Sequence, residues 1–168
     1  MAGKTSRKSA KIAKKAAAKR VAAQPTLLAG GNPTIAKADG DAPVITAIAP
    51  FFIVADMAAT LSFYRDKLGF ALTFQEPPPD DFFAIVRRDE AMIMFKDVGV
   101  APVPNCDREP AARWDAYLNV PDPDALAAEL ASRGVTFSVP LKDTDDGLRG
   151  FELRDTDGYV LFFGRPRT

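Results

Sequence analysis

The sequence predicts an α+β fold made of two copies of a strand–helix–three-strand unit. A short apolar segment, an Asp, an amphipathic stretch and a Gly occur twice in this order, and strand-like segments follow each time. The matching pairs are Val54-Ala55-Asp56 with Val120-Pro121-Asp122, and Gly69-Phe70 with Gly134-Val135. Asp and Gly are 13 positions apart in the first copy (56 to 69) and 12 in the second (122 to 134). This internal repeat indicates a duplicated βαβββ chain.

The first copy opens with an apolar segment that leads into a helix. Val44 to Val54 is rich in β-branched and aromatic residues, which predicts a strand buried on both faces. Asp56 suits the helix N-cap, because its carboxylate accepts free N–H groups and its charge complements the helix dipole. Gly69 supplies a left-handed stop. The apolar stripe of this helix is formed by Met57, Leu61, Tyr64 and Leu68.

The remaining elements follow from short apolar runs and turn residues. The second helix is expected to start at Asp122-Pro123-Asp124, with Pro at its first position. Lys96 to Ala112 is rich in Pro and charge and is expected to link the two copies. The predicted strands after the first are Phe70–Phe74, Phe82–Arg87, Ala91–Phe95, Trp114–Val120, Val135–Val139, Gly150–Asp155 and Tyr159–Gly164.

Charge is divided unevenly along the chain. Residues 1–43 hold nine Lys or Arg and two Asp, a net charge of +7 (9 − 2), whereas residues 44–168 hold 13 bases and 20 acids, or −7. The first segment offers little apolar bulk against its ordering entropy, so we expect a basic disordered tail before a domain at 44–168. This tail is either a solvated leader or a weak, salt-dependent contact for nucleic acid or for the acidic domain itself.

The composition also bears on the compartment. The 168 residues include no apolar run long enough to span a membrane, so no membrane association is expected. A single cysteine, Cys106, excludes an internal disulfide and favours the reducing cytoplasm. Because the chain has no His to pair with it, Cys106 is a poor candidate for a catalytic thiol.

The repeat has a familiar counterpart. A βαβββ duplication with FYRDKLGF in the first half and RDTDGYVLFF in the second resembles the vicinal oxygen chelate superfamily, which includes glyoxalase I, extradiol dioxygenases and bleomycin resistance proteins. The resemblance covers about Ile45 to Arg165, with repeats at about 45–96 and 113–165. It implies curled mixed sheets around a cavity with the helices outside, and, in the enzymes, a divalent metal held by His, Glu or Gln from four strands.

The four metal-ligand positions that the resemblance implies are poorly suited to a metal in this chain. They correspond to Ala49, to a place within Met92 to Phe95 that has no carboxylate, to Asp115 and to Phe162. A catalytic metal requires three or more N, O or S donors, and one carboxylate does not supply them. We therefore predict no metal and no other cofactor, which favours a protein that is not an enzyme.

Two further segments, DDFFAIVRRDE (80–90) and LRGFELRDTDG (148–158), are similar to the metal-free bleomycin resistance proteins. This implies a homodimer whose cavities lie at the subunit interface and sequester a bleomycin-like, cationic and planar ligand. Period-two alternation places Asp115, Tyr117 and Asn119 on the same face of their predicted strand. Phe82, beside Asp80 and Asp81, offers an aromatic ring with adjacent negative charge, which suits a cation. The candidate ligand-binding residues are Asp80, Asp81, Phe82, Asp115, Tyr117 and Asn119.

Each of these residues also has a plainer interpretation. Tyr117 and Phe82 are alternatively core residues, and Asp115 is alternatively an ion-pair partner of Arg149 or Arg113. Two functions remain open. The first is a binding protein that sequesters its ligand without turnover, and the second is a metal-independent enzyme, lyase-like or isomerase-like, that uses Asp115 as a general base in an apolar cavity.

Overall fold

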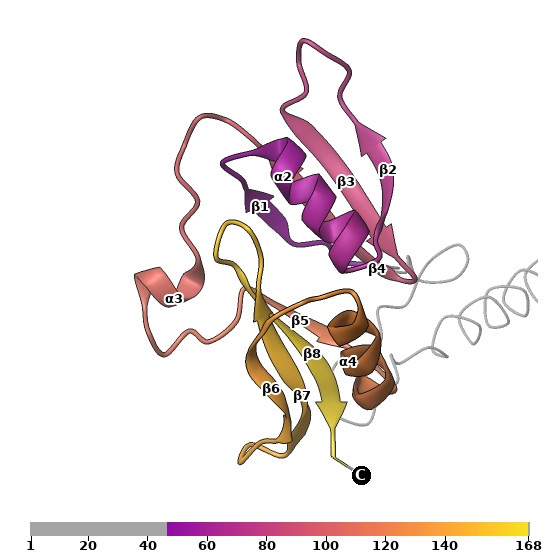
Figure 1. The fold of residues 1–168 in the computed structure, drawn as a ribbon. Helices are drawn as coiled ribbons and strands as arrows, with labels where there is room; N and C mark the ends of the chain where they lie inside the picture. Colours follow the sequence, from indigo (N-terminus) through magenta and orange to yellow (C-terminus); the bar gives the residue numbers. More distant parts are fainter. Residues whose placement is uncertain (1–46, 168) are drawn as a thin grey trace, which may run out of the picture. The chain divides into compact units, whose positions relative to one another are not determined.

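The structure is a computed structural model that describes residues 47–167, so the predicted tail lies outside the described residues. The described chain forms two four-stranded sheets, each accompanied by helices (Figure 1). In the first copy the elements are β1 (Phe51–Ile53), α2 (Met57–Ser62), the π-helical segment η1 (Phe63–Lys67), β2 (Ala71–Gln75), β3 (Phe83–Arg88) and β4 (Ala91–Lys96). The second copy contains β5 (Ala116–Asn119), α4 (Pro123–Ser132), β6 (Phe137–Asp143), β7 (Leu148–Arg154) and β8 (Val160–Pro166), and α3 (Asn105–Arg108) lies between the copies.

The two sheets have the same topology. Their strand orders are β1-β4-β3-β2 and β5-β8-β7-β6. In each sheet the first strand runs parallel to the last strand of its copy, and the other pairs are antiparallel. The predicted α+β fold with two mixed sheets is therefore confirmed. Within residues 47–167 neither sheet closes on itself, and β1 and β5 are edge strands there.

The helices begin and end where the repeat predicts. The carboxylate of Asp56 accepts the N–H of Ala59 at 2.9 Å, and the carboxylate of Asp122 accepts the N–H of Ala125 at 3.0 Å. Gly69 and Gly134 follow the helices with φ of 73° and 72°, values at which a side chain would be strained. The same pair of residue types thus sets both ends of the helical segment in both copies.

The first strand is shorter and more exposed than predicted. Of the predicted segment 44–54, the structure describes residues 47–54, and within these only Phe51–Ile53 is strand. Phe51 is 50% exposed. Pro50 has no N–H, so it cannot donate to a ladder on the N-terminal side of β1. The expectation of a long strand buried on both faces is wrong, because helix α2 covers one face of this sheet only.

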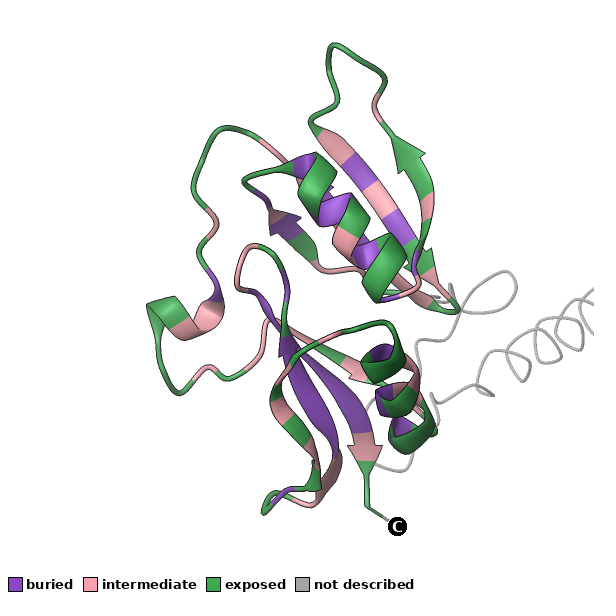
Figure 2. Ribbon diagram, viewed as in Figure 1, coloured by how far each residue is buried: buried purple, intermediate pink, exposed green. Residues whose placement is uncertain are grey.

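Buried residues alternate with half-buried ones along β3 of the first sheet, whereas β7 and β8 of the second sheet are buried over most of their length (Figure 2). In the first sheet Phe52 and Phe95 are paired and buried, whereas the neighbouring pair Phe51 and Met94 points to the other side and is partly exposed. The buried faces and the helices share a core that includes Leu61, Tyr64, Leu130, Phe151, Leu153, Leu161 and Phe163. In the described part of the chain, no helix has the length and apolar character needed to cross a membrane.

Candidate functional site

The face of the second sheet that points away from the main core carries a row of aromatic side chains. Tyr117 on β5 lies directly opposite Phe162 on β8, which in turn lies opposite Glu152 on β7. Trp114 stacks on the Phe162 ring with centroids 4.3 Å apart, and the Tyr117 ring is 5.2 Å from the same ring. We call Trp114, Tyr117 and Phe162 the aromatic platform. Phe162 is buried beneath the others, whereas Tyr117 is 42% exposed and presents a ring to solvent.

Two glycines make room for the platform. Gly150 and Gly164 are directly paired on β7 and β8. A Cβ at Gly150 would lie 2.5 Å from the Phe162 ring, and a Cβ at Gly164 would lie 2.6 Å from it. Because real Cβ atoms do not approach so closely, both positions require Gly for Phe162 to lie flat across the sheet. The Tyr117 hydroxyl donates to the Gly164 carbonyl at 3.3 Å.

A buried carboxylate fixes the indole of the platform. Glu152 accepts hydrogen bonds from Trp114 Nε1 at 2.8 Å and from Arg113 at 3.0 Å. The Arg113 guanidinium also lies 4.6 Å from the Trp114 ring centroid and pairs with Asp146. A buried carboxylate is stable when it is paired in this way. The Glu152 charge therefore orients the platform and is already compensated by a cation of the protein.

Asp115 lies at the end of the platform and is held by backbone groups. Its two oxygens accept the N–H groups of Asn105 and Val160, both at 2.7 Å. The expected pairing with Arg149 or Arg113 is not observed, because these two arginines pair with other carboxylates. Asp115 lines a pocket of about 420 Å³ together with Arg108 and β1. It joins α3 to β8 and adds one carboxylate to that pocket.

Two of the three residues predicted on one face of β5 are exposed. Tyr117 and Asn119 are open to solvent, whereas Ala116 and Leu118 pack against the core. Asn119 lines a different pocket from Asp115, toward the β3–β4 turn. The alternation along β5 therefore spreads its polar groups over two pockets.

The remaining candidates lie on the first sheet. Asp81 and Phe82 line a third pocket, of about 320 Å³, with Asp97, and Asp80 is exposed in the loop before them. The Lys96 ammonium lies 5.4 Å from the centroid of the Phe82 ring. The ring face that we predicted for a ligand cation is thus already next to a cation of the protein. The structure does not gather the six predicted residues into one pocket.

The open face of the first sheet is apolar. Phe83 packs between Phe51 and Phe74, with ring centroids 6.1 and 5.9 Å apart, and Ile85 and Met94 lie directly opposite each other beside them. We call these five residues the apolar face. Phe51 and Phe74 are 50% and 45% exposed. Exposed apolar area of this kind is typical of an interaction surface.

The positions that correspond to metal ligands do not fit a metal. Phe162 is covered by Trp114, Ala49 has no donor atom in its side chain, and both Asp115 oxygens accept backbone N–H groups. Among residues 47–167, no three His, Cys, Asp or Glu side chains are close enough to hold an ion together. The chemistry of this donor set therefore does not support a resident divalent metal.

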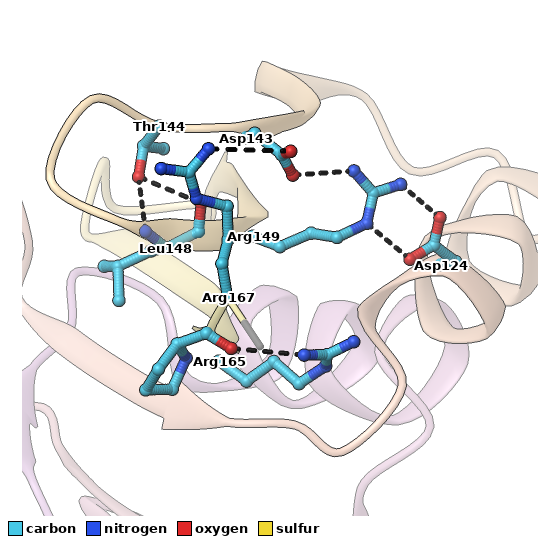
Figure 3. A network of polar contacts seen from close by, with 8 residues as sticks. Asp124, Asp143, Thr144, Leu148, Arg149, Arg165 and Arg167 are labelled. Carbon is cyan, nitrogen blue, oxygen red and sulfur yellow. Dashed lines mark hydrogen bonds and ion pairs between the residues drawn. The ribbon is translucent and has the colours of Figure 1, made fainter.

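A second polar cluster holds helix α4 against its sheet (Figure 3). Arg149 on β7 donates to both oxygens of Asp124 in the first turn of α4, and to Asp143 on β6 at 2.9 Å. These hydrogen bonds lower the pKa of Asp124. Asp143 also pairs with Arg167 at 3.8 Å. Because each carboxylate here has an arginine partner, the cluster has a structural role.

The most strongly perturbed carboxyl lies in the turn between β7 and β8. Asp155 accepts the Tyr64 hydroxyl at 2.9 Å and the N–H groups of Asp157 and Tyr159 at 3.0 and 2.9 Å. Burial raises the pKa of Asp155 to about 6, although these three donors oppose the shift. Burial also raises the pKa of Tyr64. This pair joins the first helix to the second copy.

The fold and this site define a class of protein: a duplicated βαβββ chain whose two sheets each carry aromatic side chains on the face away from the main core. A family model identifies the class. The chain belongs to the glyoxalase/bleomycin resistance protein/dioxygenase superfamily, whose model matches residues 45–163. The recognised resemblance is thereby confirmed. No curated protein matches the sequence.

Several solved structures share this fold. The bleomycin-binding protein of Streptomyces verticillus, solved with copper(II)-bleomycin, is 26% identical with a TM-score of 0.55, covering 73% of this chain and 97% of its own. TnmS3, an antibiotic binding protein from Streptomyces sp. CB03234, is 23% identical with a TM-score of 0.55, covering 75% and 99%. A glyoxalase-related enzyme from Clostridium phytofermentans is 16% identical with a TM-score of 0.57, covering 74% and 97%.

Proposed function

We propose that this protein binds a planar, cationic aromatic small molecule and sequesters it without chemical conversion. The aromatic platform is the observation that carries the proposal. It presents an exposed Tyr117 ring and a fixed Trp114 ring where enzymes of the superfamily are expected to hold a metal. Stacked aromatic rings suit a planar ligand, and their faces attract cations.

Charge supports a cationic ligand. Residues 44–168 carry 20 acids and 13 bases, so the body attracts cations at long range. At the platform, Arg113 neutralises the charge of Glu152. Among residues 47–167, by contrast, Asp115 accepts hydrogen bonds from backbone N–H groups only. Asp115 is therefore the carboxylate that we assign to the ligand's positive charge. The bleomycin-binding protein and TnmS3 bind antibiotics, which supports this ligand class.

The apolar face supports a homodimer. Phe51 and Phe74 are exposed there beside three half-buried apolar side chains, and contiguous exposed apolar surface is typical of a protein interface. A second copy covering this face would bury the rings and close the binding cavity between subunits. Light scattering on the full chain tests this: we expect a dimer, which Phe51→Ser with Phe74→Ser converts to a monomer. A wild-type monomer would contradict the dimer.

The general-base alternative is less well supported than the binding role, because both Asp115 oxygens accept backbone hydrogen bonds that favour the ionised carboxylate, whose charge still attracts a cation. A cytoplasmic location and nucleic-acid contact by residues 1–43 stay predictions from the sequence.

Trp114 provides a direct test of the platform. It is the single tryptophan of the chain, so its fluorescence reports on a ligand that stacks beside it. We expect bleomycin or another planar cationic antibiotic to change this emission with a saturable dependence on concentration. The ligand should be recovered unchanged. Asp115→Asn should weaken binding, and neither the wild type nor this variant should convert the ligand.

Tyr117 supplies the matched control. Tyr117→Ala removes the exposed ring and should weaken binding by about tenfold, the value of one aromatic contact of 1 to 2 kcal/mol. Tyr117→Phe retains the ring and should bind like the wild type. Equal binding by Tyr117→Ala, consumption of the ligand, or one tightly bound zinc, nickel or iron per chain in the purified protein would overturn the proposal.

A further inference from the structure

The two copies differ in the turn that joins their last two strands. Five residues, Asp155 to Tyr159, connect β7 to β8, whereas two residues, Asp89 and Glu90, connect β3 to β4. Each turn lies beside the other copy, near the start of its helix and its first strand. We call the region between each turn and the other copy a junction. The two junctions have corresponding surroundings, but the β3–β4 turn is three residues shorter than the β7–β8 turn.

The longer turn reaches into its junction and leaves there the smaller pocket, of about 420 Å³, that Tyr159 lines with Asp115. Asp157 accepts the Ala55 N–H at 3.0 Å and the Thr60 hydroxyl at 3.1 Å. The Tyr159 ring stacks on Phe52 with centroids 4.3 Å apart, and its hydroxyl donates to the Ile53 carbonyl at 2.9 Å. The Tyr159 ring and the Asp157 carboxylate thus lie between this turn and the first strand and helix of the other copy.

The shorter turn leaves its junction open. In the repeat, Val54 matches Val120, so Leu118 corresponds to Phe52 and Asn119 to Ile53. Leu118, Asn119 and the short turn line a pocket of about 630 Å³, within the size range of small-molecule sites. No side chain of the two-residue turn replaces the Tyr159 ring there. The Asn119 carbonyl lies on edge strand β5, in the place that corresponds to the acceptor of the Tyr159 hydroxyl.

The pocket has apolar walls and an acidic rim. Leu126 and Phe163 add to the wall formed by Leu118. Four carboxylates line the pocket against one guanidinium, that of Arg88, and Arg88 is already bound to Glu129 at 2.7 Å and to the Leu68 carbonyl. Of the remaining carboxylates, Glu90 pairs with Arg87, so Asp89 and the helix cap Asp122 give the rim its negative potential.

We propose that this pocket is a second ligand site, separate from the aromatic platform, which takes a phenolic amine: a single aromatic ring with a hydroxyl donor and a positively charged amino group. The ring takes the place that the Tyr159 side chain has in the other junction, and its hydroxyl donates to the Asn119 carbonyl. The amino group lies at the acidic rim, where charge complementarity favours it over a carboxylate.

Tyramine is the probe, and isothermal titration of the full chain is the measurement. We expect one tyramine bound per chain, weaker binding of phenethylamine, which lacks the hydroxyl, and no binding of 4-hydroxyphenylacetate, which carries the opposite charge. Absence of tyramine binding, or equal binding of all three compounds, would overturn the proposal.

Two alanines of helix α4 give a matched pair of variants. Ala125 lines the pocket and Ala128 is exposed on the same helix outside it. Ala125→Trp fills the pocket and should weaken tyramine binding by at least about tenfold, whereas Ala128→Trp should stay within about twofold. Ala91→Phe fills the pocket from β4 and gives the same test should Ala125→Trp fail to fold, which circular dichroism monitors.

The platform variant separates this proposal from the proposed function. Tyr117→Ala should leave tyramine binding intact, while Ala125→Trp should leave binding of planar antibiotics to the platform intact, measured by isothermal titration because this variant adds a second tryptophan. Loss of tyramine binding in Tyr117→Ala would place tyramine on the platform and overturn the second site. A change of oligomeric state in Ala125→Trp but not in Ala128→Trp would assign the pocket to a second copy of the chain, and would also overturn it.

Discussion

The β7–β8 turn and the β3–β4 turn occupy corresponding places in the two copies but contribute differently to the molecule. Asp155 in the longer turn is buried and hydrogen-bonded to Tyr64, whereas Glu90 in the shorter turn has a side chain that is 98% exposed. Buried polar groups are costly unless every partner is present, so the longer turn makes its junction specific and rigid. The difference shows how a duplicated chain can assign stability to one junction and leave space at the other.

Removing the Asp155 carboxylate should produce the largest effect on stability. Asp155→Ala leaves the buried Tyr64 hydroxyl and two backbone N–H groups without an acceptor. At about 1 to 3 kcal/mol for each unsatisfied group, partly relieved by relaxation, we expect a loss of about 3 to 5 kcal/mol in the free energy of unfolding. Urea denaturation followed by circular dichroism measures it.

The shorter turn supplies the control for this comparison. Glu90→Ala removes an exposed carboxylate whose partner, Arg87, is also exposed, so the change should stay within about 0.5 kcal/mol. Equal losses in Asp155→Ala and Glu90→Ala would show that the two junctions do not differ in the way the structure indicates.

The pH dependence of stability should reveal the same buried carboxyl. Its pKa is raised from 3.8 to about 6 by burial, so the folded state holds this proton more tightly than the unfolded state. The resulting stabilisation is fully present below pH 4 and is lost as the pH rises through 6. Between pH 4 and 7 the wild type should therefore lose up to about 3 kcal/mol relative to Asp155→Asn.

Comparison with Asp155→Asn is needed because other carboxyls act in the opposite direction. The pKa values of Asp124 and Glu129 are lowered by hydrogen bonds from arginines, so both groups destabilise the fold as the pH falls. These groups are present in both proteins and cancel in the difference. A wild type that gains stability relative to Asp155→Asn as the pH rises would show that the three donors outweigh burial.

The sequence predicted the repeated scaffold well because its signals are local. Asp56 and Asp122 cap helices, and Gly69 and Gly134 end the helical segments, through interactions within a few residues. The length of β1 was mispredicted, because an apolar run does not show how much of a strand has a neighbour to cover it.

The binding residues were harder to predict because they depend on contacts between distant segments. Period-two alternation along β5 identified Tyr117 but not Trp114, which precedes the strand and is positioned by Glu152, 38 residues away. Phe82 was predicted to face a ligand cation, yet Lys96 from the adjacent strand lies over its ring. Periodicity indicates which face a side chain points to, but not which side chain of the protein already fills that space.

The two helix caps should contribute equally to stability, unlike the two turns. Asp56→Ala and Asp122→Ala each remove one carboxylate that accepts a helix N–H, at 2.9 and 3.0 Å. Each should lower the free energy of unfolding by about 1 kcal/mol. Chemical denaturation of both variants measures the two values side by side. A difference above about 1 kcal/mol between them would show that the asymmetry of the turns extends to the helix starts.

The ion pair beside the short turn should give the smallest effect. Arg88 joins the first copy to the second, because it donates to the Leu68 carbonyl and to Glu129 of α4 at 2.6 and 2.7 Å. Its side chain is 25% exposed, so solvent screens the pair only in part. Arg88→Met should cost about 0.5 to 1 kcal/mol at low salt and less at high salt, whereas Arg87→Met should cost almost nothing. Denaturation at two salt concentrations distinguishes them. If the loss of stability in Arg88→Met were the same at both salt concentrations, the aliphatic stem of Arg88, rather than its charge, would hold the open junction together.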